Sequence, residues 1–204
     1  MRDLFIVGAG GFGREAVWTV ERINALGGGV PQWRIIGYAD DDPKWTKGDN
    51  FEGYPILGSV ETASKDNPGA SVFVAIGNNK KRADIYRRLR GHDFPVIIDP
   101  KAQVSPTTEF RHGSYIAAGA VVQVGATLGK FVIVGANAVV SHDAVVGDFV
   151  NMGPGTVIAS GVKVGNEVSF YANSATMPWI TIGDGASITC GAAAKADVPA
   201  GATI

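Results

Sequence analysis

The sequence contains a single cysteine, Cys190, among 204 residues. One cysteine excludes an intrachain disulfide and fits a reducing compartment. No apolar run is long enough to span a membrane, and the apolar run at residues 4–7 is too short for a signal peptide. Charged residues are also few, at 18% of the sequence, and they nearly balance to a net charge of −1. This balance provides no basic surface for nucleic acid. Together the absences predict a soluble cytoplasmic protein.

What the sequence does contain is a six-residue repeat. Fifteen of eighteen positions spaced six apart hold Ile, Val, Leu, Met or Phe, and no shift of phase is visible. A short uninterrupted period predicts a solenoid. The positions are Ile98, Val104, Phe110, Ile116, Val122, Leu128, Val134, Val140, Val146, Met152, Ile158, Val164, Phe170, Thr176, Ile182, Ile188, Ala194 and Ala200.

Turn-forming residues recur three positions after these apolar residues. Six is a multiple of two, so a strand keeps its alternation of inward and outward side chains through each repeat. Each hexad therefore predicts a short strand and a corner, and stacked corners give a parallel β-helix. The expected corner residues are Gly113, Gly119, Gly125, Asn137, Asp143, Gly155, Gly161, Asn173, Gly185, Gly191 and Asp197.

Residues 1–97 follow a different pattern, in which apolar strands alternate with helices. Strands are expected at residues 4–7, 35–38, 72–76 and 96–98, and helices at 14–26 and 79–90, the first ending at the glycines of 27–29. This alternation predicts a compact α/β, Rossmann-like domain at 1–97, followed by the β-helix at 98–204.

A glycine-rich motif, G-x-G-x-x-G, occupies residues 8–13 between the first strand and the first helix. Gly10, the second glycine of the motif, would let the backbone approach a phosphate at the helix N-terminus, and Asp40 and Asp41 would read a ribose or a base edge. Gly11 and Phe12 are expected to bind the substrate as well. A domain of this length provides only half of a dinucleotide fold, so a nucleotide diphosphate fits better than NAD. Alternatively, the glycines only pack the strand against the helix.

Two features follow the third expected strand. Gly77 and Asn78 could also line the nucleotide site, although Asn78 could equally cap the next helix. That helix is basic, and we interpret its cations mainly as a solvated face. They are Lys80, Lys81, Arg82, Arg87, Arg88 and Arg90.

Two unrelated signals in this order, the glycine-rich domain and the hexad repeat, resemble the bacterial sugar acetyltransferases of the PglD/NeuD type. The residues that carry the resemblance are 8–13, Asp40-Asp41, 75–79 and 140–148. The resemblance implies a left-handed triangular β-helix of about six coils, a homotrimer, and a nucleotide-linked amino sugar held by the N-terminal domain. It also implies acetyl-CoA as co-substrate, bound at the boundary between subunits.

The resemblance also assigns site residues. His142 matches the catalytic base and Asp143 its acidic neighbour, a pairing suited to removing a proton from an amine near neutral pH. The acetyl-CoA contacts map to Asn151, Ser160, Ala172 and Cys190. With 18 residues per coil, Ser160 stacks on His142. We interpret Cys190 as a buried small hydrophobe, and the histidine spacing predicts no metal site.

Some residues depart from the family. Gly135 and Asn151 stand where asparagine and histidine are frequent, and Phe12 stands where the UDP-sugar enzymes often have histidine. The sequence also ends at Ile204 without the V-G-x-P-A-K tail, which a truncated sequence would explain.

The resulting prediction is an acetyl-CoA-dependent N-acetyltransferase for a nucleotide-linked sugar, expected to be a UDP-4-amino sugar, in surface glycan assembly. The alternatives are a sugar or sialic acid O-acetyltransferase and a non-catalytic nucleotide-sugar-binding scaffold.

Overall fold

The computed structural model describes residues 1–26 and 31–204 and divides into two compact units. The first unit is Met1–Pro100 and the second is Lys101–Ile204, so the division falls three residues after the expected boundary. The predicted stop of the first helix at residues 27–29 lies outside the described residues. Within the described part of the chain, no helix has the length and apolarity required to cross a bilayer.

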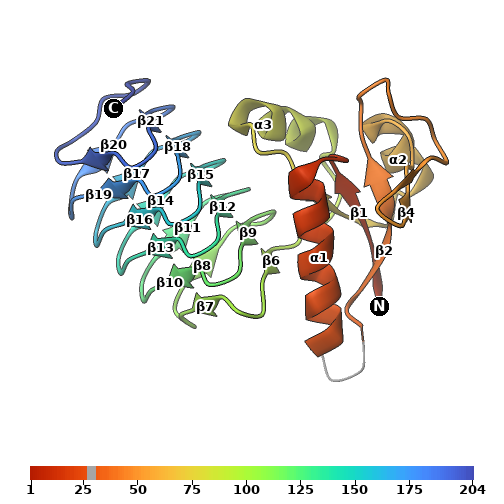
Figure 1. Cartoon of the computed structure of the whole chain (residues 1–204), viewed down its shortest axis with the longest axis horizontal. Helices are drawn as coiled ribbons and strands as arrows, with labels where there is room; N and C mark the ends of the chain where they lie inside the picture. The colour runs from red at the N-terminus through yellow and green to blue at the C-terminus, as the bar shows by residue number, and fades with distance from the viewer. Residues whose placement is uncertain (27–30) are drawn as a thin grey trace. The chain divides into compact units, whose positions relative to one another are not determined.

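The first unit is built on a parallel three-stranded sheet (Figure 1). β1 (Arg2–Val7) lies between β2 (Trp33–Ala39) and β5 (Ser71–Val74). The last four residues of β1 and all of β5 are buried, as expected for a parallel sheet covered on both faces. The predicted α/β, Rossmann-like arrangement is confirmed.

Two predicted helices follow strands of this sheet, one after β1 and the other after β5. α1 (Gly11–Leu26) starts three residues earlier than expected, because the glycine loop leads directly into its first turn. Ala16 and Val20 face inward as predicted. α3 (Asn79–Arg88) ends two residues before Arg90 and buries Ile85.

The pattern of apolar residues missed a hairpin and a short helix. β3 (Asn50–Phe51) and β4 (Tyr54–Pro55) have only two residues each, too few for a visible alternation. α2 (Val60–Asp66) is mostly polar and buries only Val60 and Ala63, so it has no clear apolar stripe. The unit ends with β6 (Ile97–Ile98), close to the expected fourth strand.

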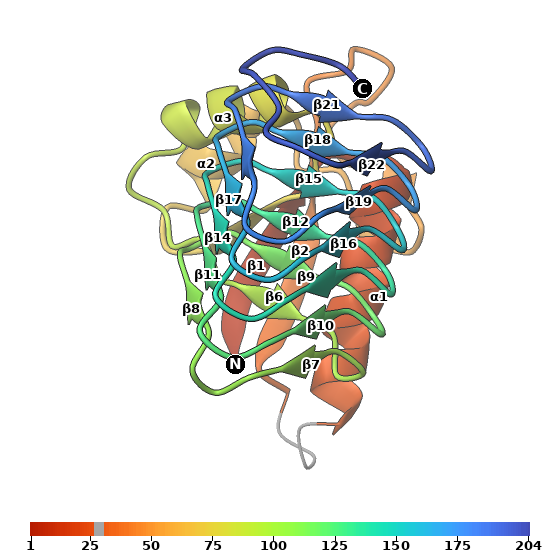
Figure 2. The ribbon, with the colours of Figure 1, turned by 90° about the vertical axis from the view of Figure 1, so that its left-hand side faces the viewer.

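The second unit is a parallel β-helix, in which sixteen two-residue strands give just over five coils (Figure 2). Its strands form three sheets. The first contains β7 (Gln103–Val104), β10 (Val121–Val122), β13 (Val139–Val140), β16 (Val157–Ile158), β19 (Ala175–Thr176) and β22 (Ala193–Ala194). The second contains β8 (Glu109–Phe110), β11 (Thr127–Leu128), β14 (Val145–Val146), β17 (Lys163–Val164) and β20 (Thr181–Ile182). The third contains β9 (Tyr115–Ile116), β12 (Ile133–Val134), β15 (Asn151–Met152), β18 (Ser169–Phe170) and β21 (Ser187–Ile188).

The strand register repeats every 18 residues. Val121 pairs with Val139, and Val139 pairs with Val157. The second residue of each strand points inward, so the hexad positions from Ile116 to Ala194 form a buried column on each sheet. The stacking expected from the hexad spacing is therefore observed.

Most corners have one residue in the left-handed region. Asn137 (φ 57°) and Asp143 (φ 59°) adopt this conformation as predicted. Four residues that the sequence did not suggest adopt it as well: Phe131, Phe149, Glu167 and Trp179. Hydrogen bonds between successive corners hold these residues there, which shows that the stacked register outweighs local preference.

The hexad phase shifts after Ala194, so the expectation of an unbroken phase was wrong at the last positions. Val198 pairs with Ile182, only 16 residues away, and it is buried where Ala200 was expected. Asp197 does not form a left-handed corner; instead its carboxylate accepts a hydrogen bond from the Thr181 N–H (2.7 Å). The last coil is therefore two residues shorter than the 18-residue repeat of the preceding coils.

Candidate functional site

The glycine loop follows β1 and leads into α1, and two of its glycines are needed for packing. Gly8 has φ 109°, and a side chain there would lie 2.8 Å from the Ala75 carbonyl oxygen. A side chain at Gly13 would overlap the Gly8 carbonyl oxygen. The alternative interpretation, that glycines pack the strand against the helix, therefore describes these two positions.

Three other glycines at the same edge of the sheet have open space around them. A Cβ at Gly10, Gly11 or Gly77 would meet no protein atom within 4 Å. None of the three has a φ in the left-handed region. Neither packing nor backbone conformation accounts for glycine there, whereas a ligand that approaches the start of α1 would.

A pocket of about 730 Å³ opens beside this loop. A volume of this size suits a nucleotide-sized ligand. Its lining combines two lysines at the start of α3 with the acidic residues that follow β2. The lining residues are Val7, Gly8, Asp40, Asp41, Asp42, Val60, Ile76, Lys80, Lys81, Asp84, Ile85 and Arg88.

Asp40 binds the glycine loop. Its Oδ2 accepts a hydrogen bond from the Ala9 N–H (2.7 Å), and its Oδ1 accepts one from the Asp42 N–H (2.9 Å). The carboxylate thus ties the end of β2 to the loop that follows β1. The role this arrangement supports most directly is holding the loop in place.

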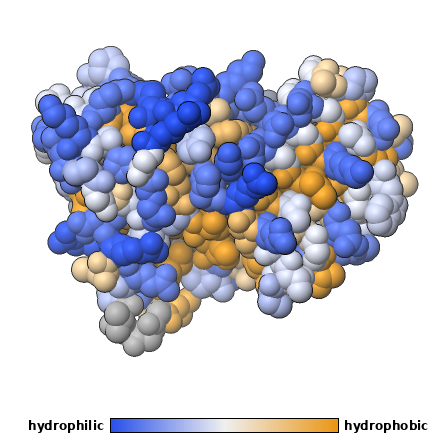
Figure 3. All heavy atoms as spheres, turned by 180° about the vertical axis from the view of Figure 1, so that it is seen from behind, coloured by the Kyte–Doolittle hydropathy of each residue, from blue (hydrophilic) through white to orange (hydrophobic). Residues whose placement is uncertain are grey.

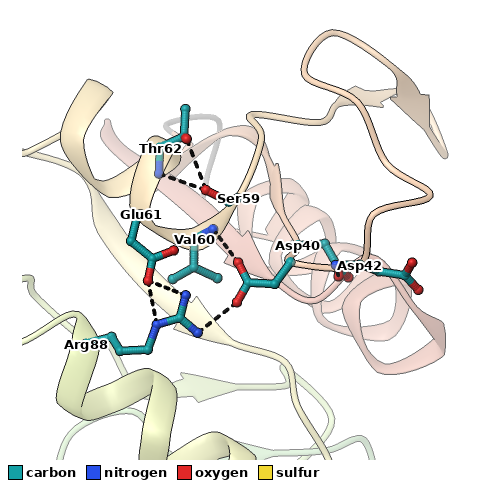
Figure 4. A network of polar contacts seen from close by, with 8 residues as sticks. Asp40, Asp42, Ser59, Val60, Glu61, Thr62 and Arg88 are labelled. Atoms are coloured by element: carbon teal, nitrogen blue, oxygen red, sulfur yellow. Dashed lines mark hydrogen bonds and ion pairs between the residues drawn. The ribbon is translucent and has the colours of Figure 1, made fainter.

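Asp41 belongs to an ion-pair network with Arg88 and Glu61, two partners that Figure 4 labels. Its carboxylate accepts hydrogen bonds from the Val60 N–H at the start of α2 (2.9 Å) and from Arg88 Nη1 at the end of α3 (2.7 Å). Arg88 Nε also donates to Glu61 (2.7 Å). Burial raises the pKa of Asp41, but the hydrogen bonds from Arg88 and Val60 outweigh it and hold the pKa below its usual value. The hydrogen bond to Asp41 is likewise the main cause of a raised pKa for Arg88.

The expectation of a solvated basic face on α3 was wrong for Arg82. This side chain is 1% exposed, and its Nη1 donates to the carbonyl oxygens of Ile76 (2.7 Å) and Gly77 (3.1 Å). The buried guanidinium fixes the backbone that follows β5, where Ile76 lines the pocket. Lys80, Lys81, Arg87 and Arg90 are exposed, as predicted.

Two other residues predicted to contact the nucleotide, Phe12 and Asn78, each have a structural role in this unit. Phe12 packs edge-to-face on Phe73, with 6.0 Å between ring centroids, so much of its ring belongs to the packing of the unit. Asn78 caps α3 by accepting a hydrogen bond from the Lys81 N–H (2.9 Å). The capping alternative for Asn78 is therefore the one observed.

His142 and Asp143 form a hydrogen-bonded pair in the β-helix unit, at the corner after β13. His142 Nδ1 lies 2.8 Å from Asp143 Oδ2, and the two side chains are 47% and 59% exposed. An ionised carboxylate can only accept, so Nδ1 carries the hydrogen and Nε2 of the neutral ring is left as the basic nitrogen. The backbone N–H of His142 donates to Gln123 Oε1 (3.1 Å).

A groove of about 440 Å³ lies beside this pair, on the outer face of β7 and β10. His142 forms one of its walls. The other lining residues are Gln103, Val104, Ser105, Val121, Val122, Gln123 and Val124.

The predicted acetyl-CoA contacts fall into separate columns. Ser160 lies one coil beyond His142 at the same corner, where the Gly161 N–H donates to the His142 carbonyl (3.0 Å). Ala172 and Cys190 stack at another corner, where the Gly191 N–H donates to the Ala172 carbonyl (3.0 Å), and Asn151 is in β15. Cys190 is exposed, so its interpretation as a buried hydrophobe was wrong.

Among residues 1–26 and 31–204, no cluster of three or more His, Cys, Asp or Glu side chains could hold a metal ion.

Comparisons with known proteins cover both units. The sequence profile of the PglD N-terminal domain matches residues 3–89. The acetyltransferase domain of PglB from Neisseria gonorrhoeae FA1090, solved in complex with acetyl coenzyme A, is 31% identical with a TM-score of 0.87. That alignment covers 99% of this chain and 95% of the domain. A search of curated proteins finds no match.

Two further solved structures share the whole fold. One is a perosamine N-acetyltransferase from Caulobacter crescentus in which a histidine is replaced by asparagine, in complex with CoA and GDP-perosamine. It is 26% identical, with a TM-score of 0.88 over 100% of this chain and 93% of that one. WeeI from Acinetobacter baumannii AYE is 24% identical, with a TM-score of 0.86 over 100% and 96%, and supports the fold alone. The β-helix is left-handed, as the resemblance implied.

Proposed function

Since the chain belongs to the PglD-type sugar acetyltransferases of the hexapeptide-repeat superfamily, we propose that it N-acetylates a nucleotide-linked amino sugar with acetyl-CoA. The observation that carries this proposal is the 2.8 Å contact between His142 Nδ1 and Asp143 Oδ2 at a solvent-accessible corner. The whole-chain similarity to an acetyltransferase domain that binds acetyl coenzyme A supports it.

His142 acts as the general base in this proposal. The sugar amine attacks the thioester carbon, Nε2 accepts a proton from the nitrogen, and the C–S bond breaks as the amide forms. The CoA thiolate takes up that proton, which returns His142 to its neutral form. Asp143 holds the ring with Nε2 free and stabilises the imidazolium that forms transiently.

Backbone N–H groups assist the same step. We assign the Ser160 N–H, one coil beyond His142, to the thioester oxygen as it becomes an oxyanion, and the Cys190 N–H, Ala172 and Asn151 to the rest of the cofactor. An oxyanion donor of this kind lowers a barrier by about 3 kcal/mol. Cys190 has no nucleophilic role here.

The nucleotide diphosphate of the acceptor binds at the glycine loop. The open space at Gly10, Gly11 and Gly77 and the exposed amines of Lys80 and Lys81 suit a phosphate group, and the N-terminus of α1 adds the positive end of the helix dipole. We assign the sugar-nucleotide role to this pocket, with Phe12, Asp40, Asp41 and Asn78 shaping its rim.

A homotrimer and a cytoplasmic location are further parts of the proposal. The outward positions of the first sheet are apolar over five coils: Val121, Val139, Val157, Ala175 and Ala193. Apolar residues also reach the surface of this unit on the face turned to the viewer in Figure 3, at its right. Such a stripe suits a second copy of the chain. Val157→Glu should then lower the mass measured by light scattering from trimer to monomer, and a monomeric unsubstituted protein would contradict the trimer.

The decisive experiment is an acetyl-transfer assay with a panel of UDP- and GDP-linked amino sugars. His142→Ala should abolish transfer and leave acetyl-CoA binding nearly intact, and near-normal turnover by this variant would refute the base assignment. Mass spectrometry before and after mild alkali identifies the product, because an ester hydrolyses and an amide survives. An alkali-labile product would identify an O-acetyltransferase, and no transfer to any acceptor would favour a binding scaffold.

A further inference from the structure

The coil that precedes the His142–Asp143 pair touches both members of it. Residues 123–125 stand 18 positions before 141–143, in the register in which Val121 pairs with Val139. The Asp143 N–H donates to the Val124 carbonyl oxygen (3.1 Å), so the two corners lie directly against each other. Gln123 and Gly125 flank this contact.

Gly125 provides the space that the Asp143 carboxylate occupies. A Cβ built on Gly125 would lie only 2.6 Å from Asp143 Oδ1, and the next nearest atom, Cγ of the same carboxylate, is 3.7 Å away. The other oxygen, Oδ2, binds His142 Nδ1 at 2.8 Å. The carboxylate thus contacts the glycine through one oxygen and the imidazole through the other, and a side chain at 125 would displace it from the position in which it holds the ring.

Gln123 fixes the backbone of His142. Its Oε1 accepts the hydrogen bond from the His142 N–H at 3.1 Å, and both residues line the groove beside the pair. A ring attached to a tethered backbone and held at Nδ1 by a confined carboxylate has little freedom to turn.

We propose that Gln123 and Gly125 are positioning residues that set the orientation and tautomer of His142. The inference rests on the proposed function of His142 as the base. Neither residue touches the reacting atoms, because both act through the pair.

The same corner geometry occurs elsewhere without a histidine, which provides a matched control. Gly119 has φ 71°, close to the 69° of Gly125, and a Cβ there would overlap Asn137 Oδ1. Alanine at either position therefore brings the same backbone strain and displaces a side chain of similar size. Only Gly125→Ala displaces a carboxylate that holds His142.

Kinetics provide the first test. Gly125→Ala should lower kcat by about 10- to 100-fold with little change in the KM for acetyl-CoA, since displacements near 1 Å can cost on the order of 100-fold. Gly119→Ala should keep kcat within about twofold. In the Asp143→Ala background, Gly125→Ala should have no further effect on kcat. An equal loss of kcat in Gly125→Ala and Gly119→Ala would overturn the proposal. So would a Gly125→Ala substitution that lowers kcat as much in the Asp143→Ala background as it does in the unsubstituted enzyme.

Ring-nitrogen NMR tests the positioning without turnover. In protein with ¹⁵N-labelled histidine, His142 is assigned by its absence in His142→Asn and should show a protonated Nδ1 and an unprotonated Nε2. Gly125→Ala should give a mixture of tautomers, and Gly119→Ala should not. Unchanged His142 shifts in Gly125→Ala would overturn the proposal. This readout remains valid if the enzyme acetylates no tested sugar, so the two proposals can fail separately.

Gln123 provides a variant with no backbone cost, which also covers poor folding of Gly125→Ala. Gln123→Ala should lower kcat about fivefold, which is the change in rate that corresponds to the net free energy of one lost hydrogen bond. Gln123→Glu keeps an acceptor oxygen and should therefore retain most of the unsubstituted kcat. Equal activity of Gln123→Ala and the unsubstituted enzyme would remove Gln123 from the proposal.

Discussion

The glycine loop contains two kinds of glycine, and one pair of substitutions separates them. A side chain at Gly13 would overlap the Gly8 carbonyl oxygen and approach the Tyr38 ring to 3.3 Å, so α1 must move away from β1. Overpacking of this kind costs about 1–3 kcal/mol, and the higher helix propensity of alanine returns about 0.5–1 kcal/mol. Because the clash is with backbone, we expect Gly13→Ala to lose about 2 kcal/mol, or roughly 4–8 °C in Tm for a chain of this size.

Gly11→Ala should behave in the opposite way. Nothing lies within 4 Å of its new methyl group, and Gly11 is the first residue of α1. The free energy of unfolding should therefore stay constant or rise by up to about 1 kcal/mol, and Tm should be unchanged or higher. The methyl group would protrude into the space assigned to the phosphate. A loss of about 1.4 kcal/mol of binding raises the KM for the nucleotide sugar about tenfold.

Two measurements on the same samples decide this prediction: thermal unfolding by circular dichroism and the KM for the nucleotide sugar. A Gly11→Ala variant with unchanged KM would refute the assignment of the loop to a phosphate. A Gly13→Ala variant with unchanged Tm would refute the packing argument.

Three further changes test other parts of the structure. Asp41 has a lowered pKa, so its stabilising contribution is present above its unfolded pKa of about 3.9 and is lost as the pH falls through the folded pKa. The difference in the free energy of unfolding between the unsubstituted protein and Arg88→Met should therefore shrink in urea titrations as the pH falls below about 4, and a constant difference would contradict the ion pair. Arg82→Met should cost about 1–3 kcal/mol in the same titrations, because the carbonyl oxygens that Arg82 binds lose their donor; a neutral result would show that water replaces it. Phe170→Ala, at a side chain that is 1% exposed, should cost about 3–5 kcal/mol, and a loss under 1 kcal/mol would mean that the β-helix core closes around the cavity.

Periodic features of the fold could be predicted from the sequence because they repeat. The hexad series gave the strands, the inward column and the stacking of Ser160 on His142, since each coil repeats the same constraint. The β3–β4 hairpin and α2 could not be predicted in this way, because each occurs once and buries few apolar side chains. The corner residues Phe131 and Trp179 were missed for a related reason: stacking imposes a conformation that their own preferences disfavour.

The candidate sites show the same limit at the level of single side chains. The sequence located Asp40 and Asp41 beside the glycine loop, but it could not show that their oxygens already accept hydrogen bonds from Ala9 and Arg88. Arg82 was classed with its exposed neighbours because a run of cations gives no sign of which one turns inward. The helical position of Arg82, three residues before the buried Ile85, was the only available signal.

The 18-residue register has a consequence for how such a protein can change in length. Removing one whole coil ahead of the His142–Asp143 corner would leave every later residue on the same side of the β-helix, in the column that it occupies now. Removing a single hexad would also preserve the alternation along the strands, yet it would turn everything after it by one third of a revolution. If the hexad removed lies between Val124 and His142, the His142–Asp143 corner would move to a neighbouring edge of the β-helix, away from the groove lined by Val121 and Gln123. We therefore expect this unit to vary in length by whole coils, because a shorter deletion changes which edge carries the His142–Asp143 pair.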